Sequence, residues 1–375
     1  MDFSYTEEQQ MLQDSVQKFV QQNYDFDSRN KIIASESGIS EEYWNLFAEL
    51  GWLTVPFSED VGGFGGSAID LIVMMEEFGK ANLVEPYLSA AVLSGGLVSE
   101  LGGEEQKSTM LSALMEGSLQ LACAFSESGS RYNLANVSTT ARAEGDGWVI
   151  EGEKIAVLGA GNAPKHLVVA RESGDSLDSA GISVFVVDSN QDTVKMTEYT
   201  TVDGRKSANV TYQSARAEAR LGDSGTALPA LQRVIDRCTV AVAAEAVGAL
   251  EVLLQRTVEY SKTRKQFGVP IGTFQALQHR MADMFVECQL ARSIVVMAAM
   301  KLDSAADEQE KSRAVSAAKS RVGKSIRRVG EEAIQIHGGI GMTEELDVGH
   351  FFKRVTAIEL MFGDSEHHTD RYASL

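Results

Sequence analysis

The stretch RKQFGVPIGTFQALQH, residues 264–279, lies between two segments with long helical periodicity. It combines an arginine, a glutamine and two aromatic rings with a Gly-Val-Pro-Ile-Gly bend. A guanidinium can bind phosphate oxygens through two hydrogen bonds, and aromatic rings stack on flat bases. The stretch therefore suits a clamp for a diphosphate and an adenine, although a plain inter-helical loop, with Gly and Pro making the turn, is the competing interpretation.

Two further motifs accompany this stretch. Gln335–Met342, QIHGGIGM, stands at the end of a helical pattern, where its glycines either cap the helix or let the backbone approach a phosphate closely. Ala122–Glu127, ACAFSE, is typical of a strand that leads into a polar turn.

The chain divides into three parts by its hydrophobic pattern. Up to about residue 117 the periodicity is helical, with Thr6 as an N-cap and an apolar stripe formed by Met11, Leu12, Val16, Phe19 and Val20. Short β-rich runs follow until Leu221, and helical periodicity then returns in three long patterns. This order favours separate domains over alternating βαβ units. We expect domains at 1–117, 118–222 and 223–375, with long helices at 225–262, 274–303 and 311–337.

KIAVLGAGNA, residues 154–163, looks like the start of a dinucleotide-binding fingerprint. Pro164, however, occupies the position of the third glycine, and the strand-like run 166–170 follows where a crossover helix is required. The pattern favours a glycine turn between antiparallel strands.

Composition limits the possible partners. The net charge of −19 argues against nucleic acid and anionic membranes, which an acidic surface repels. Cys123, Cys238 and Cys288 are too far apart in sequence to suggest a disulfide framework or a zinc site, so we expect buried thiols in a reducing compartment. With no signal-peptide pattern and no apolar run long enough for a membrane span, we expect a cytoplasmic protein.

Together and in this order, the motifs resemble those of the acyl-CoA dehydrogenase family, and the resemblance covers essentially the whole chain. It implies an α+β fold with an N-terminal helical domain, a middle β-barrel or sandwich domain and a C-terminal four-helix bundle. It also implies FAD held between subunits, with the flavin ring on one chain's middle domain and the ADP portion clamped by a neighbouring chain's bundle. By this match the clamp consists of Arg264, Gln266, Phe267, Phe274, Gln335, Gly338 and Gly339.

The family's reaction is α,β-dehydrogenation of an acyl-CoA thioester, in which a carboxylate takes the α-proton and the β-hydride goes to the flavin. The family's usual glutamate stands just before a Gly-Thr pair, where this chain has Phe362 before Gly363. Some members place the glutamate on the first helix of the C-terminal domain, where this chain has Cys238, followed by Thr239 in place of a common arginine. The resemblance thus predicts no catalytic residue at either base position.

The flavin-ring half also departs from the family pattern. The family's T-E-P-x-A-G-S-D is here Ser126–Asn133, with the bulky Tyr132 at the position of a small serine. The family's K-x-W-I-T-N is here a stretch in which Ala156, Val157 and Leu158 carry neither an aromatic ring nor a hydroxyl.

These uneven losses lead to the hypothesis of a base-less subunit in a heteromeric acyl-CoA dehydrogenase, probed below. A sister subunit would supply the base and the flavin wall, and this chain would complete the sister's FAD site in a heterotetramer. Gly79–Leu88 and Gly349–Val355 resemble stretches of bacterial paired subunits that act on steroid side-chain CoA esters. Besides the acyl-CoA substrate and the sister subunit, an electron-transfer flavoprotein is a candidate partner.

Three alternatives stay open at this point. The first is an active homo-oligomer with a relocated base, for which Asp364 is the best spare carboxylate, ahead of Glu359, Glu366 and Glu245. The second is a relative that uses its flavin for reduction or monooxygenation, and the third is a non-enzymatic scaffold. The adjacent His367 and His368 suggest surface residues more than a metal site.

Overall fold

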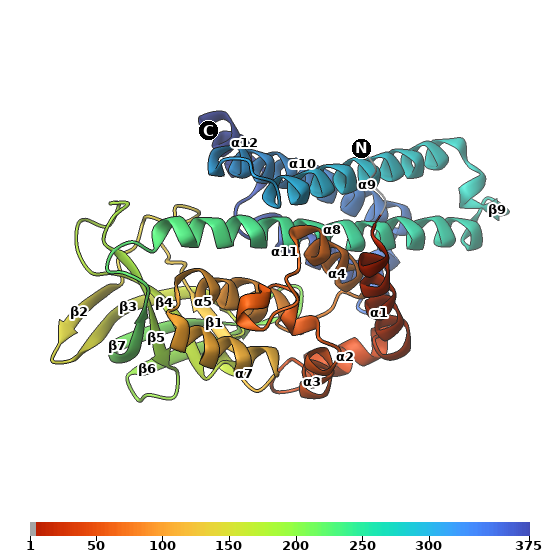
Figure 1. Ribbon diagram of the computed structural model, residues 1–375. Coiled ribbons are helices and arrows are strands. Elements are labelled where there is room, and N and C mark those ends of the chain that lie inside the picture. Colours follow the sequence, from red (N-terminus) through yellow and green to blue (C-terminus); the bar gives the residue numbers. More distant parts are fainter. Residues whose placement is uncertain (1–4) are drawn as a thin grey trace. The chain divides into compact units, whose positions relative to one another are not determined.

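A computed structural model describes residues 5–375, and the chain forms two compact units. The unit called here the helical unit comprises Met1–Lys31, Ser67–Leu83 and Thr239–Leu375, described from Tyr5 onward. The unit called here the β unit comprises Ile32–Gly66 and Val84–Cys238. Along the chain, helices come first, strands follow and long helices end it, which confirms the predicted α+β fold class (Figure 1). The boundaries at residues 117 and 222 stay predictions.

The β unit is built on a seven-stranded sheet that closes on itself. The strands run in the order β1-β4-β2-β3-β7-β5, β6 pairs with β7, and β5 pairs back with β4, so that β4, β2, β3, β7 and β5 form a ring of paired strands. This is the predicted barrel. The strands are β1 Leu121–Ala124, β2 Thr140–Glu144, β3 Gly147–Leu158, β4 Lys165–Arg171, β5 Ile182–Asp188, β6 Val194–Thr200 and β7 Lys206–Leu221.

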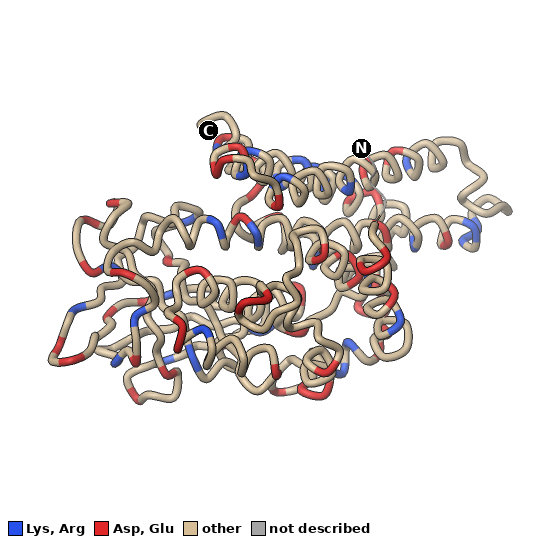
Figure 2. Tube along the Cα trace, viewed as in Figure 1, with Lys and Arg blue, Asp and Glu red and all other residues tan. Residues whose placement is uncertain are grey.

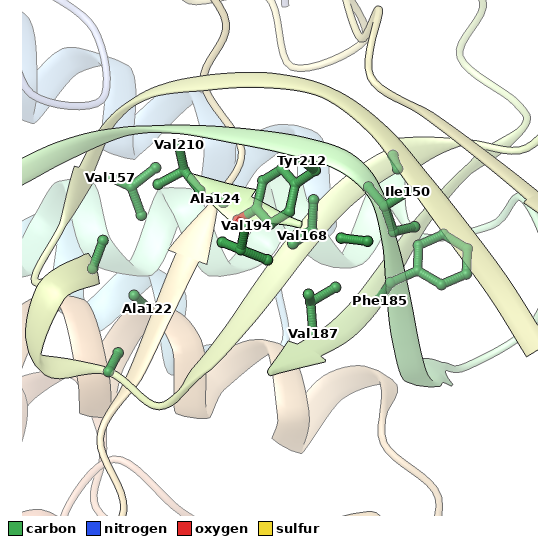
Figure 3. Packing of buried hydrophobic residues seen from close by; sticks show 14 of the residues in the cluster. Ala122, Ala124, Ile150, Val157, Val168, Phe185, Val187, Val194, Val210 and Tyr212 are labelled. Atoms are coloured by element: carbon green, nitrogen blue, oxygen red, sulfur yellow. The ribbon is translucent and has the colours of Figure 1, made fainter. Parts of the chain in front are cut away.

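Alternating apolar residues of these strands fill the inside of the barrel. Ile150, Val168, Phe185, Val187 and Tyr212 are almost completely buried and lie together in one cluster (Figure 3). Such burial contributes roughly 25 cal/mol per Å² of apolar surface and holds the strands in register.

Helices complete the β unit. They are α3 Glu41–Glu49, α5 Gly96–Leu101, α6 Glu104–Gln106 and α7 Ser112–Met115, with the π-helical turns η3 Tyr87–Gly95 and η4 Lys107–Leu111 and the 3-10 turns η1 Trp52–Thr54, η2 Glu59–Val61 and η5 Ala160–Asn162. Helix α2, Phe26–Ala34, begins in the helical unit and ends in the β unit.

The helical unit consists mainly of long helices. It contains α1 Glu7–Asn23, α4 Ala68–Ala81, α9 Gln275–Leu302, α10 Glu308–His337, α11 Asp347–Leu360, α12 Ser365–Ser374 and the larger part of α8 Leu228–Thr263, with β8 Lys265–Gln266, β9 Val269–Pro270 and the 3-10 turns η6 Ile271–Thr273 and η7 Gly338–Met342 in the connections. Helices α9 and α10 lie side by side (Figure 1). The three long helices lie close to the ranges expected from periodicity.

Helices α4 and α8 approach each other through two glycines. A Cβ added to Gly79 would lie 1.9 Å from the carbonyl oxygen of Glu245, and one added to Gly248 would lie 1.9 Å from that of Glu76. Only glycine permits such backbone contact. Helix α8 has the length and composition of a membrane span, yet 78% of its apolar window is buried, as in the core helix of a bundle.

Two local expectations are corrected. Thr6 does cap α1, but Met11 of the expected apolar stripe is 72% exposed, whereas Val16 and Phe19 are buried. After Leu158 a 3-10 turn and a strand follow, as expected, but β4 pairs with β1, β2 and β5 and not with β3. The glycine turn therefore connects strands that are not neighbours in the sheet.

Charged residues are spread along the whole trace and are not confined to one tail (Figure 2). This distribution fits a folded acidic protein, and all three cysteines are buried and free, as predicted.

Candidate functional site

The predicted clamp residues gather at one end of the helical unit. Helix α8 ends at Thr263, the short β8–β9 hairpin follows, and α9 begins at Gln275. The rings of Tyr260 and His337 stack with centroids 4.4 Å apart, which places the end of α8 beside the end of α10. Two segments that residues 275–334 separate in the sequence are thereby brought together. We call this region, residues 264–274 with 335–339, the clamp end.

The clamp end presents its chemistry outward. Phe267 is 94% exposed with a φ of +54°, and it contacts Phe274 edge-on at 6.2 Å between centroids. Arg264 and Gln335 are exposed as well. A Cβ added to Gly338 or Gly339 would meet no atom within 4 Å, so the backbone there is open to a ligand.

These residues fit the ADP portion of FAD. A guanidinium and open glycine backbone suit a diphosphate, and exposed aromatic rings suit an adenine. An exposed ring on a left-handed backbone has an energetic cost of about 1–2 kcal/mol, which favours a binding role over a packing role.

The two flavin-facing stretches, residues 126–132 and 154–158, also lie together, within the β unit. The backbone N–H of Ile155 donates to the carbonyl of Ser126 at 2.9 Å, and the ammonium of Lys154 lies 2.7 Å from the carboxylate of Glu127. Lys154 is completely buried. Burial acts to raise the pKa of Glu127, but the Lys154 charge and two backbone N–H donors outweigh it and lower that pKa. These backbone and ion-pair contacts, which we call the frame, hold the two stretches together.

The side chains on this frame do not fit a flavin ring. Ala156 is exposed with a φ of +53° in a bulge of β3, and it offers only a methyl group. Arg131 has a φ of +47° at the position of the family's glycine, and its guanidinium lies 5.6 Å from the centre of the Tyr132 ring. In the stretch 156–158, Ala156, Val157 and Leu158 carry neither an aromatic ring nor a hydroxyl, so this stretch offers a flavin ring only apolar side-chain contacts.

Neither family base position carries a proton acceptor. Phe362 lies half-buried between α11 and α12 with a φ of +57°. Cys238 is fully buried, and burial raises the pKa of its thiol far above neutrality. A thiol in that state is inert as a base.

Most of the spare carboxylates have structural hydrogen bonds or ion pairs. Asp364 caps α12 by accepting from the backbone N–H of His367 at 2.8 Å. Glu359 accepts from the backbone and the hydroxyl of Ser365 at 3.1 and 2.6 Å. Glu245 is buried in a two-bond ion pair with Arg354 at 2.7 and 2.6 Å. The fourth, Glu366, is exposed in the first turn of α12.

The expectation for the two histidines is half wrong. His367 is partly exposed, but His368 is 1% exposed, and its Nε2 lies 3.1 Å from the carbonyl oxygen of Phe362. Lys319, which sequence reasoning did not single out, is also completely buried beside this loop. Its signal was its place in α10 among the apolar positions Val315 and Val322, where a lysine needs a buried partner.

One cavity of about 300 Å³ lies between α8 and α9, lined by residues that include Glu251, Phe285 and Arg292. No candidate site residue lines it.

Three family models match the chain in the expected order. They are the N-terminal domain of acyl-CoA dehydrogenase at residues 6–118, the middle domain at 122–215 and the C-terminal domain at 228–374. The chain belongs to the acyl-CoA dehydrogenase family.

Relatives of this family match over nearly the whole length. The probable acyl-CoA dehydrogenase YngJ of Bacillus subtilis is 30% identical over 374 residues, covering 98% of this chain and 97% of the relative. Among solved structures, a variant of the steroid ACAD Tcur3481-Tcur3483 has a TM-score of 0.87 and 28% identity, covering 98% of this chain and 97% of that one. A chain of the ChsE4-ChsE5 complex from Mycobacterium tuberculosis has a TM-score of 0.88 and 25% identity, covering 100% and 98%.

Family membership settles the general chemistry. The chain belongs to a family of FAD-dependent oxidoreductases, and FAD, when bound, supplies the hydride-transfer chemistry. In this chain the residues that fit the cofactor are those of the clamp end.

Proposed function

We propose that this chain is the non-catalytic subunit of a heteromeric acyl-CoA dehydrogenase. Its clamp end grips the ADP portion of an FAD whose flavin ring lies on a sister subunit, and the sister supplies the carboxylate base. The assembly works in the cytoplasm as a heterotetramer on bulky CoA esters of the steroid side-chain type.

One observation carries the proposal: ligand-facing residues are present at the clamp end and replaced elsewhere. An isolated active enzyme needs a proton acceptor close to the α-carbon of its substrate. Phe362 cannot accept a proton. Asp364 and Glu359 are hydrogen-bonded to backbone at α12, and Glu245 is paired with Arg354.

The clamp end differs from these carboxylates because its functional side chains are exposed to solvent. Arg264 and Phe267 are exposed, Phe267 at 94%, so internal packing gives little reason for an arginine and an aromatic ring there. They are explained by a ligand outside this chain's own core.

The names of two structural neighbours support a partner and a substrate class. One is called a steroid ACAD with a two-part name, and the other is called a complex of two differently named chains. These descriptions belong to those proteins, and here they favour a sister subunit and a steroid-type acyl group.

The test is to purify this chain alone and again after co-expression with a neighbouring acyl-CoA dehydrogenase gene. Visible absorption and native mass are measured on both products. We expect a colourless, inactive product alone and a yellow, active mixed complex. A yellow homo-oligomer that an acyl-CoA bleaches would overturn the proposal and direct attention to Asp364 as the base.

A further inference from the structure

The loop between α11 and α12 holds a bulky residue in an unfavourable conformation. Phe362 has a φ of +57°, in the left-handed region that costs an L-residue with a side chain about 1–2 kcal/mol. Such a conformation persists only where the surroundings fix the backbone on several sides.

Buried side-chain donors provide that fixation. The ammonium of Lys319 donates to the carbonyls of Glu359 at 2.9 Å and Gly363 at 2.5 Å. With its proton on Nε2, His368 donates to the carbonyl of Phe362 at 3.1 Å. The carbonyls before, at and after the strained residue are all held by side chains from α10 and α12.

Holding this loop with a buried lysine has a free-energy cost, because a charged ammonium is removed from water. It is 0% exposed, and burial lowers the pKa of its ammonium to about 8. Lys154, which is also fully buried, is paired with the carboxylate of Glu127 at 2.7 Å, whereas Lys319 donates to two backbone carbonyls. The charges of Glu359 and Asp364 act to raise the pKa of Lys319. Burying an ammonium is unfavourable, and here two backbone carbonyls and the charges of Glu359 and Asp364 offset that cost, so the lysine is tied to this loop.

We propose that Lys319, assisted by His368, is a positioning residue that fixes the left-handed backbone at residue 362 and so sets the direction of its side chain. The fixing of the backbone by Lys319 does not depend on the proposed function. Only the role given to the side chain at position 362 rests on it. By the family resemblance, position 362 corresponds to the position of the family's base, and in this chain it carries a phenyl ring in place of a carboxylate. The loop 361–364 as held by Lys319 and His368, which we call the loop mount, presents the phenyl ring of Phe362. This ring is an apolar surface and not a proton acceptor.

The test uses the difference between alanine and glycine at residue 362. Glycine is favoured over alanine where φ is positive and disfavoured elsewhere, so the sign of the difference reports the backbone conformation. In the otherwise unchanged full-length chain, we expect Phe362→Gly to melt about 1–3 °C above Phe362→Ala. In the Lys319→Met background the loop relaxes, and the difference should vanish or reverse.

Val322→Ala is the matched control, because Val322 is also buried on α10 but donates to no carbonyl. It should lower both melting temperatures equally and leave the Gly–Ala difference unchanged. A difference that is the same with Lys319 and with Met would overturn the proposal, since a merely structural lysine would shift both variants alike.

If Lys319→Met does not fold, hydrogen exchange decides the matter in His368→Phe, which removes a single donor. Faster exchange confined to the amides of residues 361–364 supports the positioning role, and unchanged exchange there contradicts it. Neither measurement requires FAD or activity, so this proposal and the proposed function can fail separately.

Discussion

The clamp end of the helical unit and the flavin-facing stretches of the β unit are built in opposite ways. At the clamp end the chemical groups are exposed, as Phe267 is at 94%, and the backbone at Gly338 and Gly339 is open. In the flavin-facing stretches the ion pair of Glu127 and Lys154 is buried, while the exposed Ala156 carries only a methyl group. Buried structural contacts and ligand-facing side chains therefore vary independently in this fold, and the proposed function rests on the ligand-facing side chains.

The largest effect is expected from breaking the surviving frame. Lys154→Met leaves the Glu127 carboxylate buried with only its backbone donors, and removing one partner of a buried ion pair typically costs about 3–5 kcal/mol. Urea denaturation of the purified chain measures this loss. Lys165→Met, at a partly exposed pair on the same sheet, should cost less than about 1 kcal/mol. Equal losses in the two variants would mean that the frame is not a buried pair in solution.

At the clamp end we expect the opposite result, with little change in stability and a large change in FAD affinity. Arg264→Ala removes an exposed side chain, so stability should change by less than about 0.5 kcal/mol. FAD affinity of the mixed complex should fall roughly tenfold to a hundredfold, because a charge-assisted hydrogen bond to a phosphate contributes about 1.5–3 kcal/mol. Flavin content after gel filtration is the measurement.

Arg256→Ala is the control for this variant. Arg256 is an exposed arginine of α8 that pairs with Asp347 at 2.9 Å and lies outside the clamp set. Its loss should leave flavin content unchanged. An Arg264→Ala complex that retains FAD as well as the Arg256→Ala complex does would remove Arg264 from the clamp.

The fold was largely predictable because its signals are local. The periodicity of α8, α9 and α10 and the turn signals around β3, β4 and β5 can be read from neighbouring residues. The pairing of β4 with β1 was missed, because strand partners depend on non-local contacts. Met11 was misplaced because a helical stripe does not show where the partner surface ends.

The site was predictable to a smaller extent. The family resemblance selected the clamp residues, but their gathering at one end depends on the contact between Tyr260 and His337, which no motif encodes. Lys319 was missed, and His368 was wrongly predicted to be a surface residue, for the same physical reason. A charged or titratable residue in a helical pattern is normally solvated, and only the three-dimensional position of the loop carbonyls makes its burial favourable.

A pH experiment tests the burial of His368, which holds the loop mount. This region is buried, as the Glu127–Lys154 ion pair of the frame is, whereas the clamp end is exposed. Burial, with the charge of Lys319 and the neighbouring His367, lowers the pKa of His368 from its ordinary 6.5 to about 3; Arg371 also lowers it, and the hydrogen bond to the Phe362 carbonyl opposes the shift. Between these values the unfolded chain binds a proton that the folded chain does not, so stability falls as the pH drops below 6.5.

His368→Gln keeps an N–H donor for the Phe362 carbonyl and removes the titration. Between pH 7 and pH 5 the natural protein should lose about 2 kcal/mol of unfolding free energy relative to this variant. Denaturant melts at the two pH values measure the difference. Parallel losses in both proteins would show that His368 is not buried in its neutral form.

The smallest expected effect is that of Phe362→Glu on activity. The substitution restores a carboxylate at the family's base position, on a mount that Lys319 and His368 still hold. In the chain alone we expect no dehydrogenase activity, because a positioned base needs an adjacent hydride acceptor, and the stretches around Tyr132 and Ala156 do not form a flavin wall. Turnover of an acyl-CoA with an artificial electron acceptor is the assay. Activity in Phe362→Glu alone would mean that this chain binds the whole of FAD and that the loss of one carboxylate silenced it. If Phe362→Glu stays inactive alone while the mixed complex is active, the missing carboxylate is not the whole cause. The flavin-facing side chains around Tyr132 and Ala156 then account for the rest.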